Sequence, residues 1–106
     1  MSMNISSKLD STNSFWDVLI DGELDVSTCD KVKEHLYSLL DKEVLDIKVN
    51  LENLEYIDST GLGVLISGLK KLKETDKNII IINLRPNIIK LFEITGLNKV
   101  FIVKGV

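Results

Sequence analysis

The spacing of apolar residues changes repeatedly along this chain, from the two-residue period of a strand to the wider spacing of a helix and back. Residues 16–20 place Trp16, Val18 and Ile20 on one face, and a strict alternation of apolar and polar residues covers positions 45–51. The four isoleucines at 79–82 indicate a strand buried on both faces. We expect five strands, over residues 5–9, 16–20, 45–51 with a continuation towards residue 57, 79–82 and 100–103.

Three segments between these strands have helical spacing. The first should begin at Ser27 or Thr28 as N-terminal cap and end near Asp41, and the third should follow Pro86 and stop at Gly96. The inward stripe of the first is Cys29, Val32, Leu36, Leu39 and Leu40, and that of the second is Leu62, Leu65, Ile66, Leu69 and Leu72.

The resulting order of elements is β-β-α-β-α-β-α-β. Polar residues 10–14 join the first two strands as a hairpin loop, whereas helices separate the others. This order predicts an α/β fold with a mostly parallel sheet, an antiparallel edge hairpin and helices packed on it. A length of 106 residues suits one domain, over residues 1–106.

Composition and charge exclude several classes of function. The net charge of -3 gives no attraction for nucleic acid, and the lysines at 70, 71 and 73 are interpreted as a solvated helix end. The single cysteine, the lack of a signal-like start and the lack of a long apolar segment predict a cytoplasmic protein without membrane spans. Cys29 and His35 have no partners at metal-binding spacing, so we expect neither metal nor cofactor, a buried Cys29 and a partly buried His35.

The segment that carries chemistry is Asp58-Ser59-Thr60-Gly61, between a strand and the second helix. The simplest interpretation is that Asp58 or Ser59 caps this helix. Three glycines in or next to the helix argue for a further role, because each interior glycine costs up to about 1 kcal/mol relative to alanine. Tight internal packing would explain Gly61 and Gly68, whereas an outer face of small side chains would suit a protein partner; that face is Gly63, Val64, Ser67 and Lys71.

Four segments of the sequence resemble the STAS-domain anti-sigma factor antagonists. They are Gly-Glu-Leu-Asp at 22–25, Asn-Leu at 50–51, residues 56–64 around Asp-Ser-Thr-Gly, and Leu-Phe-Glu-Ile-Thr-Gly-Leu at 91–97. The resemblance implies a binding protein and not an enzyme. In that family the unphosphorylated protein binds an anti-sigma factor, a serine kinase, and frees a sigma factor for transcription. The kinase phosphorylates the motif serine, here Ser59, and a metal-dependent phosphatase of the PP2C type removes the phosphate.

Carried over residue by residue, the resemblance gives a partner surface around the acceptor serine. Thr60 is the second candidate for phosphorylation, after Ser59. Family members usually continue with a helix after the last strand, whereas three residues follow Val103 here, so we expect an exposed apolar patch and a monomer or weak self-association. The predicted partner-binding residues are Asp25, Asp58, Ser59, Thr60, Gly63, Val64 and Ser67.

The sequence also bears on three other functions. A serine hydrolase would need a Gly-x-Ser-x-Gly turn and a histidine base, and a receiver domain would need an acidic pair after the first strand; the sequence has neither. A STAS regulatory module of a stress-sensing complex or a transporter-associated system remains an alternative. General stress response and sporulation both remain open as the controlled process.

Overall fold

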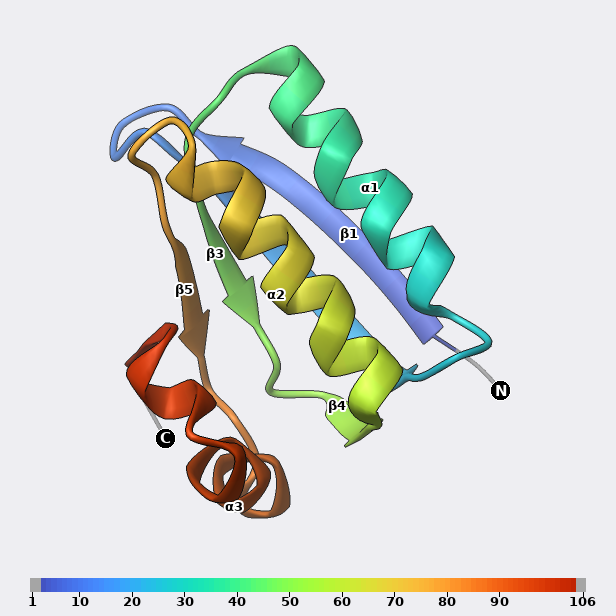
Figure 1. Ribbon diagram of the computed structural model, residues 1–106. Helices are drawn as coiled ribbons and strands as arrows, with labels where there is room; N and C mark the ends of the chain where they lie inside the picture. Colours follow the sequence, from blue (N-terminus) through green and yellow to red (C-terminus); the bar gives the residue numbers. More distant parts are fainter. Residues whose placement is uncertain (1–2, 105–106) are drawn as a thin grey trace.

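The structure is a computed structural model that describes residues 3–104. Its elements follow the expected alternation of strands and helices, with one strand more than the sequence predicts (Figure 1). They are β1 (Met3–Asp10), β2 (Phe15–Leu24), α1 (Cys29–Lys42), β3 (Asp46–Asn50), β4 (Leu54–Ile57), α2 (Ser59–Lys73), β5 (Ile79–Ile82), α3 (Pro86–Thr95), the short 3-10 helix η1 (Leu97–Lys99) and β6 (Ile102–Lys104).

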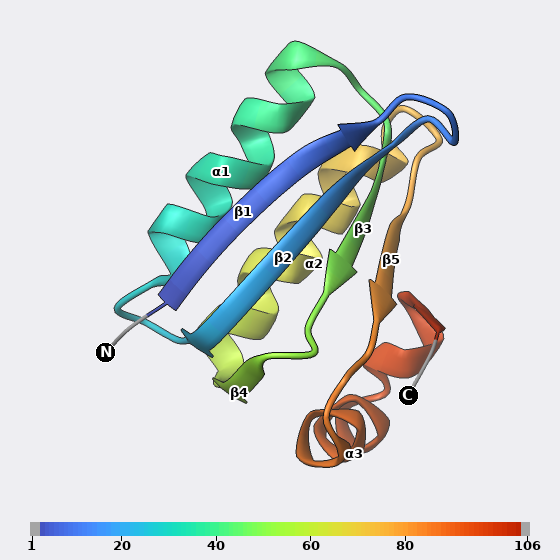
Figure 2. The same ribbon diagram turned by 180° about the vertical axis from the view of Figure 1, so that it is seen from behind.

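The six strands form one sheet in the order β1-β2-β3-β5-β6, and β4 pairs with β2. Only the β1–β2 pair is antiparallel; all other pairs are parallel. Figures 1 and 2 show α1 and α2 together on one face of the sheet and α3 beyond the end of β5. The predicted fold class is confirmed.

The predicted continuous third strand is wrong, because the chain leaves the sheet after Asn50 and returns as β4. The first half of β2, Phe15 to Leu19, pairs with β3, and its last residues, from Gly22 to Leu24, pair with β4. The register shifts next to Gly22, whose φ of 92° is open to glycine at little cost. The ten-residue β2 thus supports two short strands in succession, and β4 leads directly into α2.

The core lies between the sheet and the two helices α1 and α2. Alternate residues of β2, β3 and β5 point into it, which explains the period of two in the sequence. The expected stripe of α1 is buried throughout, and that of α2 is buried except for Ile66, which is half-buried.

Val64 lies on the buried side of α2, so its predicted place on the outer face of the second helix is wrong. Its side chain is only 9% exposed. Because α2 packs against α1 as well as the sheet, it buries a wider arc than its leucine stripe indicates, and this arc includes Gly61, Val64 and Gly68.

The other face of the sheet has no helix over it within residues 3–104 (Figure 2). One row across this face, in register, consists of Lys8, Asp17, Lys48, Ile80 and Ile102. The predicted burial of β5 on both faces is therefore wrong in part: Ile80 and Ile82 are half-buried, and Ile102 is 39% exposed. Self-association through this apolar end of the sheet stays a prediction.

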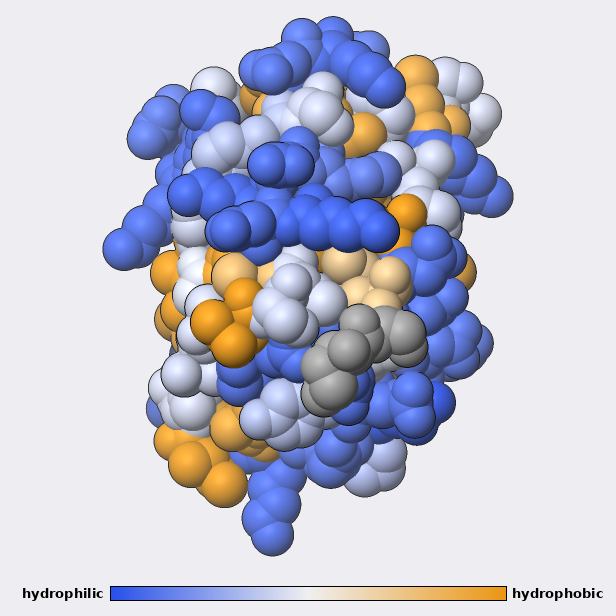
Figure 3. All heavy atoms as spheres, turned by 90° about the vertical axis from the view of Figure 1, so that its right-hand side faces the viewer, coloured by the Kyte–Doolittle hydropathy of each residue, from blue (hydrophilic) through white to orange (hydrophobic). Residues whose placement is uncertain are grey.

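The side of the molecule on which α1 lies is mainly hydrophilic, with small separate apolar groups (Figure 3). No helix in the described part of the chain is long and apolar enough to cross a bilayer.

Candidate functional site

Asp58 ties the start of α2 to the loop that follows β2. As N-cap of the helix it has extended backbone angles, and its Oδ1 accepts a hydrogen bond from the backbone N–H of Gly61 at 2.8 Å. Its Oδ2 accepts a second bond from the N–H of Val26 at 3.2 Å. The capping role that the sequence left open between Asp58 and Ser59 thus belongs to Asp58.

The loop between β2 and α1 is ordered by Asp25. Oδ1 of Asp25 accepts hydrogen bonds from the hydroxyl and the backbone N–H of Ser27, at 2.6 and 2.9 Å. The hydroxyl of Thr28 accepts from the N–H of Asp25 and donates to the carbonyl oxygen of Glu23. The Ser27 hydroxyl bond is the main reason that the pKa of Asp25 lies below its usual range, so this carboxylate is charged at neutral pH.

Asp25 was expected on the contact surface, but only 7% of it is exposed. Its carboxylate is hydrogen-bonded to Ser27 within the loop, while Val26 and Ser27 are the exposed residues of the same loop. Asp25 shapes this surface through the loop and offers little side-chain area of its own.

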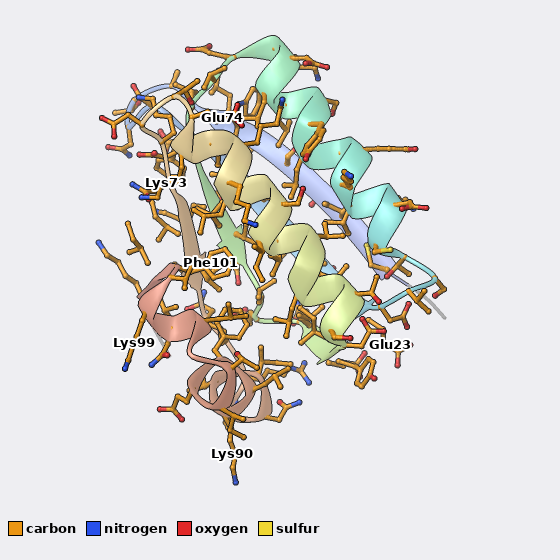
Figure 4. The ribbon with its side chains drawn as sticks, viewed as in Figure 1. Glu23, Lys73, Glu74, Lys90, Lys99 and Phe101 are labelled. Carbon is orange, nitrogen blue, oxygen red and sulfur yellow. The ribbon has the colours of Figure 1, made fainter. Side chains whose placement is uncertain are left out.

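Ser59 and Thr60 are both exposed in the first turn of α2. A negatively charged group bound here would lie at the positive end of the α2 dipole. Glu23 lies at the same end of the sheet, near the start of α2 (Figure 4). The residues predicted around Ser59 therefore lie at the same end of the sheet and along α2, although Asp25 and Val64 are not exposed.

Two exposed apolar residues beside Ser59 were not predicted as site residues. Val26 is 72% exposed and Tyr56 is 49% exposed, and both line a hollow at this end of the sheet. The remaining residues of its lining are Glu23, Asp25, Ser27 and Asp58. The available signal was an apolar residue between Asp25 and Ser27, in a loop where a polar residue would ordinarily stand.

The glycines of α2 differ in what surrounds them. A Cβ on Gly61 would lie 2.5 Å from the carbonyl oxygen of Leu24, so this position needs glycine for internal packing. A Cβ on Gly68 would make ordinary contacts, the nearest at 3.4 Å. Gly63 is exposed, and nothing lies within 4 Å of a Cβ placed there. Packing within the domain does not explain Gly63.

Ser67 continues the outer face of α2 one turn beyond Gly63. It is half-buried, and its hydroxyl shares a 2.8 Å hydrogen bond with that of Tyr37 on α1. Part of its hydrogen-bonding capacity is therefore used within the fold.

The side chains of Cys29 and His35 both have contacts within the fold. Cys29 is buried, as predicted, and half-buried His35 shares a 2.8 Å hydrogen bond between its Nε2 and the hydroxyl of Ser7 on β1. Burial, with a smaller contribution from Lys42, lowers the pKa of His35. Within residues 3–104, no group of three or more His, Cys, Asp or Glu side chains is placed to hold a metal ion.

Comparison with known proteins agrees with this geometry. The family model described as STAS domain matches residues 6–105. The anti-sigma-B factor antagonist of Staphylococcus aureus is 42% identical over 95 residues, which are 90% of this chain and 88% of that protein.

Two solved structures have the same fold at 19% sequence identity. Unphosphorylated SpoIIAA, an anti-sigma factor antagonist, has a TM-score of 0.70, covering 92% of this chain and 97% of its own. Phosphorylated SpoIIAA of Bacillus has a TM-score of 0.76, covering 97% of this chain and 91% of its own.

Proposed function

Because this chain belongs to the STAS-domain family and to its anti-sigma factor antagonists, we propose that its unphosphorylated form binds an anti-sigma factor that is a serine kinase. Binding would release the sigma factor for transcription, in the cytoplasm. STAS-type antagonists are regulatory binding proteins and not enzymes. The observation that carries the proposal is the exposed Ser59, at a capped helix start, between the exposed Val26 of the 25–28 loop and the open face at Gly63.

Ser59 is the proposed site of modification. The kinase would transfer the γ-phosphoryl group of ATP to Oγ of Ser59, and the hydroxyl proton would leave to a base of the kinase. A phosphatase of the PP2C type would hydrolyse the phosphoserine and restore the hydroxyl. Thr60 is also exposed, so exposure alone does not choose between the two hydroxyls, and the match to the family motif favours Ser59.

The proposed switch acts by charge at the interface. A phosphate on Ser59 would carry a charge of about -1.5 to -2, beside the carboxylates of Asp58 and Glu23. The helix start would tolerate it, because backbone N–H groups and the dipole favour an anion there. A partner that covers this surface would instead bury an uncompensated charge at a cost of several kcal/mol, which weakens affinity a hundredfold or more.

The proposal is tested by incubating the protein with its candidate kinase and ATP and locating any phosphate by mass spectrometry. We expect phosphate on Ser59, and Ser59→Ala should remain unmodified while still binding the kinase. Ser59→Asp should keep a near-native melting temperature and lose the kinase. Phosphate on Thr60 alone would reject the assignment of Ser59, and tight binding by Ser59→Asp would reject the charge mechanism.

A further inference from the structure

A groove of about 360 Å³ runs between α1 and the outer face of α2. It begins near Gly63, one turn after Ser59, and continues towards the end of α2. Tyr37 lines it from α1. The lining from α2 is Gly63, Ile66, Ser67, Lys70 and Lys71, followed by Glu74, the C-cap of the helix.

The groove is positively charged, although the chain as a whole has a net charge of -3. Nζ of Lys71 lies 5.2 Å from the ring centroid of Tyr37, and Nζ of Lys33 lies 5.6 Å from the same centroid. Lys70 and Lys71 line the groove, Lys33 lies next to it against the Tyr37 ring, and Glu74 is the one carboxylate in the lining. Both ring contacts are within the range of a cation–π interaction, but two ammonium groups on one ring also repel each other. An anion placed in the groove would relieve that repulsion.

The shape of the groove suits an extended backbone. Its floor contains the Tyr37–Ser67 hydroxyl pair, which provides acceptors and donors, and its end at Gly63 has no side chain to obstruct close approach. Ser59, Gly63, Ser67 and Lys71 are spaced by four residues and share one side of the helix. With a rise of 1.5 Å per residue, about 18 Å separates Ser59 from Lys71, the length of about five or six extended residues.

We propose that this groove binds an acidic segment of the anti-sigma factor, rich in Asp and Glu, that extends from Lys70 and Lys71 towards Ser59. The inference rests on the proposed function and names the chemistry of the partner surface. It also gives the switch its direction. A phosphate on Ser59 would stand at the end of the path of an acidic segment and repel it, whereas it would attract a basic one.

Binding of hexaglutamate to the isotopically labelled full chain, followed by NMR at low salt, tests the groove without any anti-sigma factor. We expect the largest shifts at Gly63, Ser67, Lys70 and Lys71, and an affinity that falls as salt rises. The double variant Lys70→Gln, Lys71→Gln should bind the peptide about fivefold or more weakly.

The matched control is Lys90→Gln with Lys99→Gln, which removes the same charge from α3 and η1. Figure 4 shows Lys90 and Lys99 away from Glu74 at the end of the groove, on the part of the molecule formed by α3 and η1, and Lys73 on the β5 side of α2. The control should bind hexaglutamate as the unchanged chain does. Equal losses in both double variants, or shifts spread over all lysines, would show attraction by charge alone and overturn the inference.

The same variants separate this inference from the proposed function. If the unchanged chain binds its kinase and the Lys70, Lys71 variant binds it equally well, the acidic segment is wrong and the antagonist function stands. If hexaglutamate occupies the groove but no kinase binds or modifies the chain, the proposed function fails and the groove remains an acidic-peptide site.

Discussion

Replacing Gly61 by alanine should destabilise the domain, because the added methyl group has no room. Its Cβ would lie 2.5 Å from the carbonyl oxygen of Leu24, 2.8 Å from Cγ of Leu24 and 2.9 Å from Cγ1 of Ile57. The closest atom belongs to the backbone of β2, and the same oxygen accepts a hydrogen bond from the N–H of Asp58 at 3.2 Å. Relief of the clash therefore has to move α2 away from β2 and strain this bond.

The magnitude follows from two opposing contributions. Overpacking of a core costs about 1–3 kcal/mol, and a backbone clash belongs at the upper end, whereas alanine in a helix gains about 1 kcal/mol over glycine. The free energy of unfolding of Gly61→Ala should fall by about 2 kcal/mol, which lowers the melting temperature by about 8–16 °C for a domain of this size. Thermal and urea unfolding, followed by circular dichroism, measure both quantities.

Gly63→Ala is the matched control, since it makes the same chemical change two residues later in the same helix. Nothing lies within 4 Å of its added Cβ, so the helical preference of alanine should raise the stability by about 0.5–1 kcal/mol. If both variants shift the melting temperature in the same direction, the close approach of α2 to β2 at Gly61 does not govern stability and the reasoning is refuted.

Three further outcomes are expected. Gly63→Trp should keep the native circular dichroism spectrum and abolish kinase binding, because it fills the open part of the outer face of α2; unchanged affinity in a titration would remove Gly63 from the interface. Cys29, at 7% exposure, should react with a thiol reagent much more slowly in native buffer than in urea, and equal rates would contradict its burial. The folded-state pKa of Asp25 is lowered chiefly by the Ser27 hydroxyl. The ionised carboxylate of Asp25 therefore contributes to the free energy of unfolding above its unfolded pKa of about 3.9, and this contribution is lost as the pH falls through its folded pKa. Ser27→Ala should therefore reduce the loss of stability between about pH 4 and the folded pKa, as urea titrations at each pH can test.

Local periodicity predicted most of the fold, since a strand or helix with one buried face has a regular spacing of apolar residues in the sequence. It did not predict β4, whose buried residues Leu54 and Ile57 are three positions apart and give no period of two. The strand exists because the last residues of β2 offer an unpaired edge, which is a property of the sheet and not of residues 54–57. Val64 was misplaced for a similar reason: its burial depends on α1 packing against α2.

The exposure of the candidate site residues agrees with the sequence prediction where it follows from a local element and differs where it depends on loop geometry. The exposure of Ser59 follows from its place in the first turn of a helix after a strand. By contrast, the buried carboxylate of Asp25 accepts a hydrogen bond from the Ser27 hydroxyl within the same loop, and Val26 of that loop is exposed. Neither direction is readable from the residue types, because aspartate is usually solvated and valine usually buried.

The residues at the start of α2 have two tasks that do not overlap. Asp58 and Gly61 face inwards: one caps the helix and binds the 25–28 loop, and the other allows the helix to touch the backbone of β2. Ser59 and Gly63 face outwards and have no such contacts to protect. Under the proposed function, a phosphate on Ser59 would change the surface and leave the inward contacts of α2 in place, so modification would not require the domain to unfold. The state of Ser59 would then be detected by a partner that covers this surface and not through a change of fold.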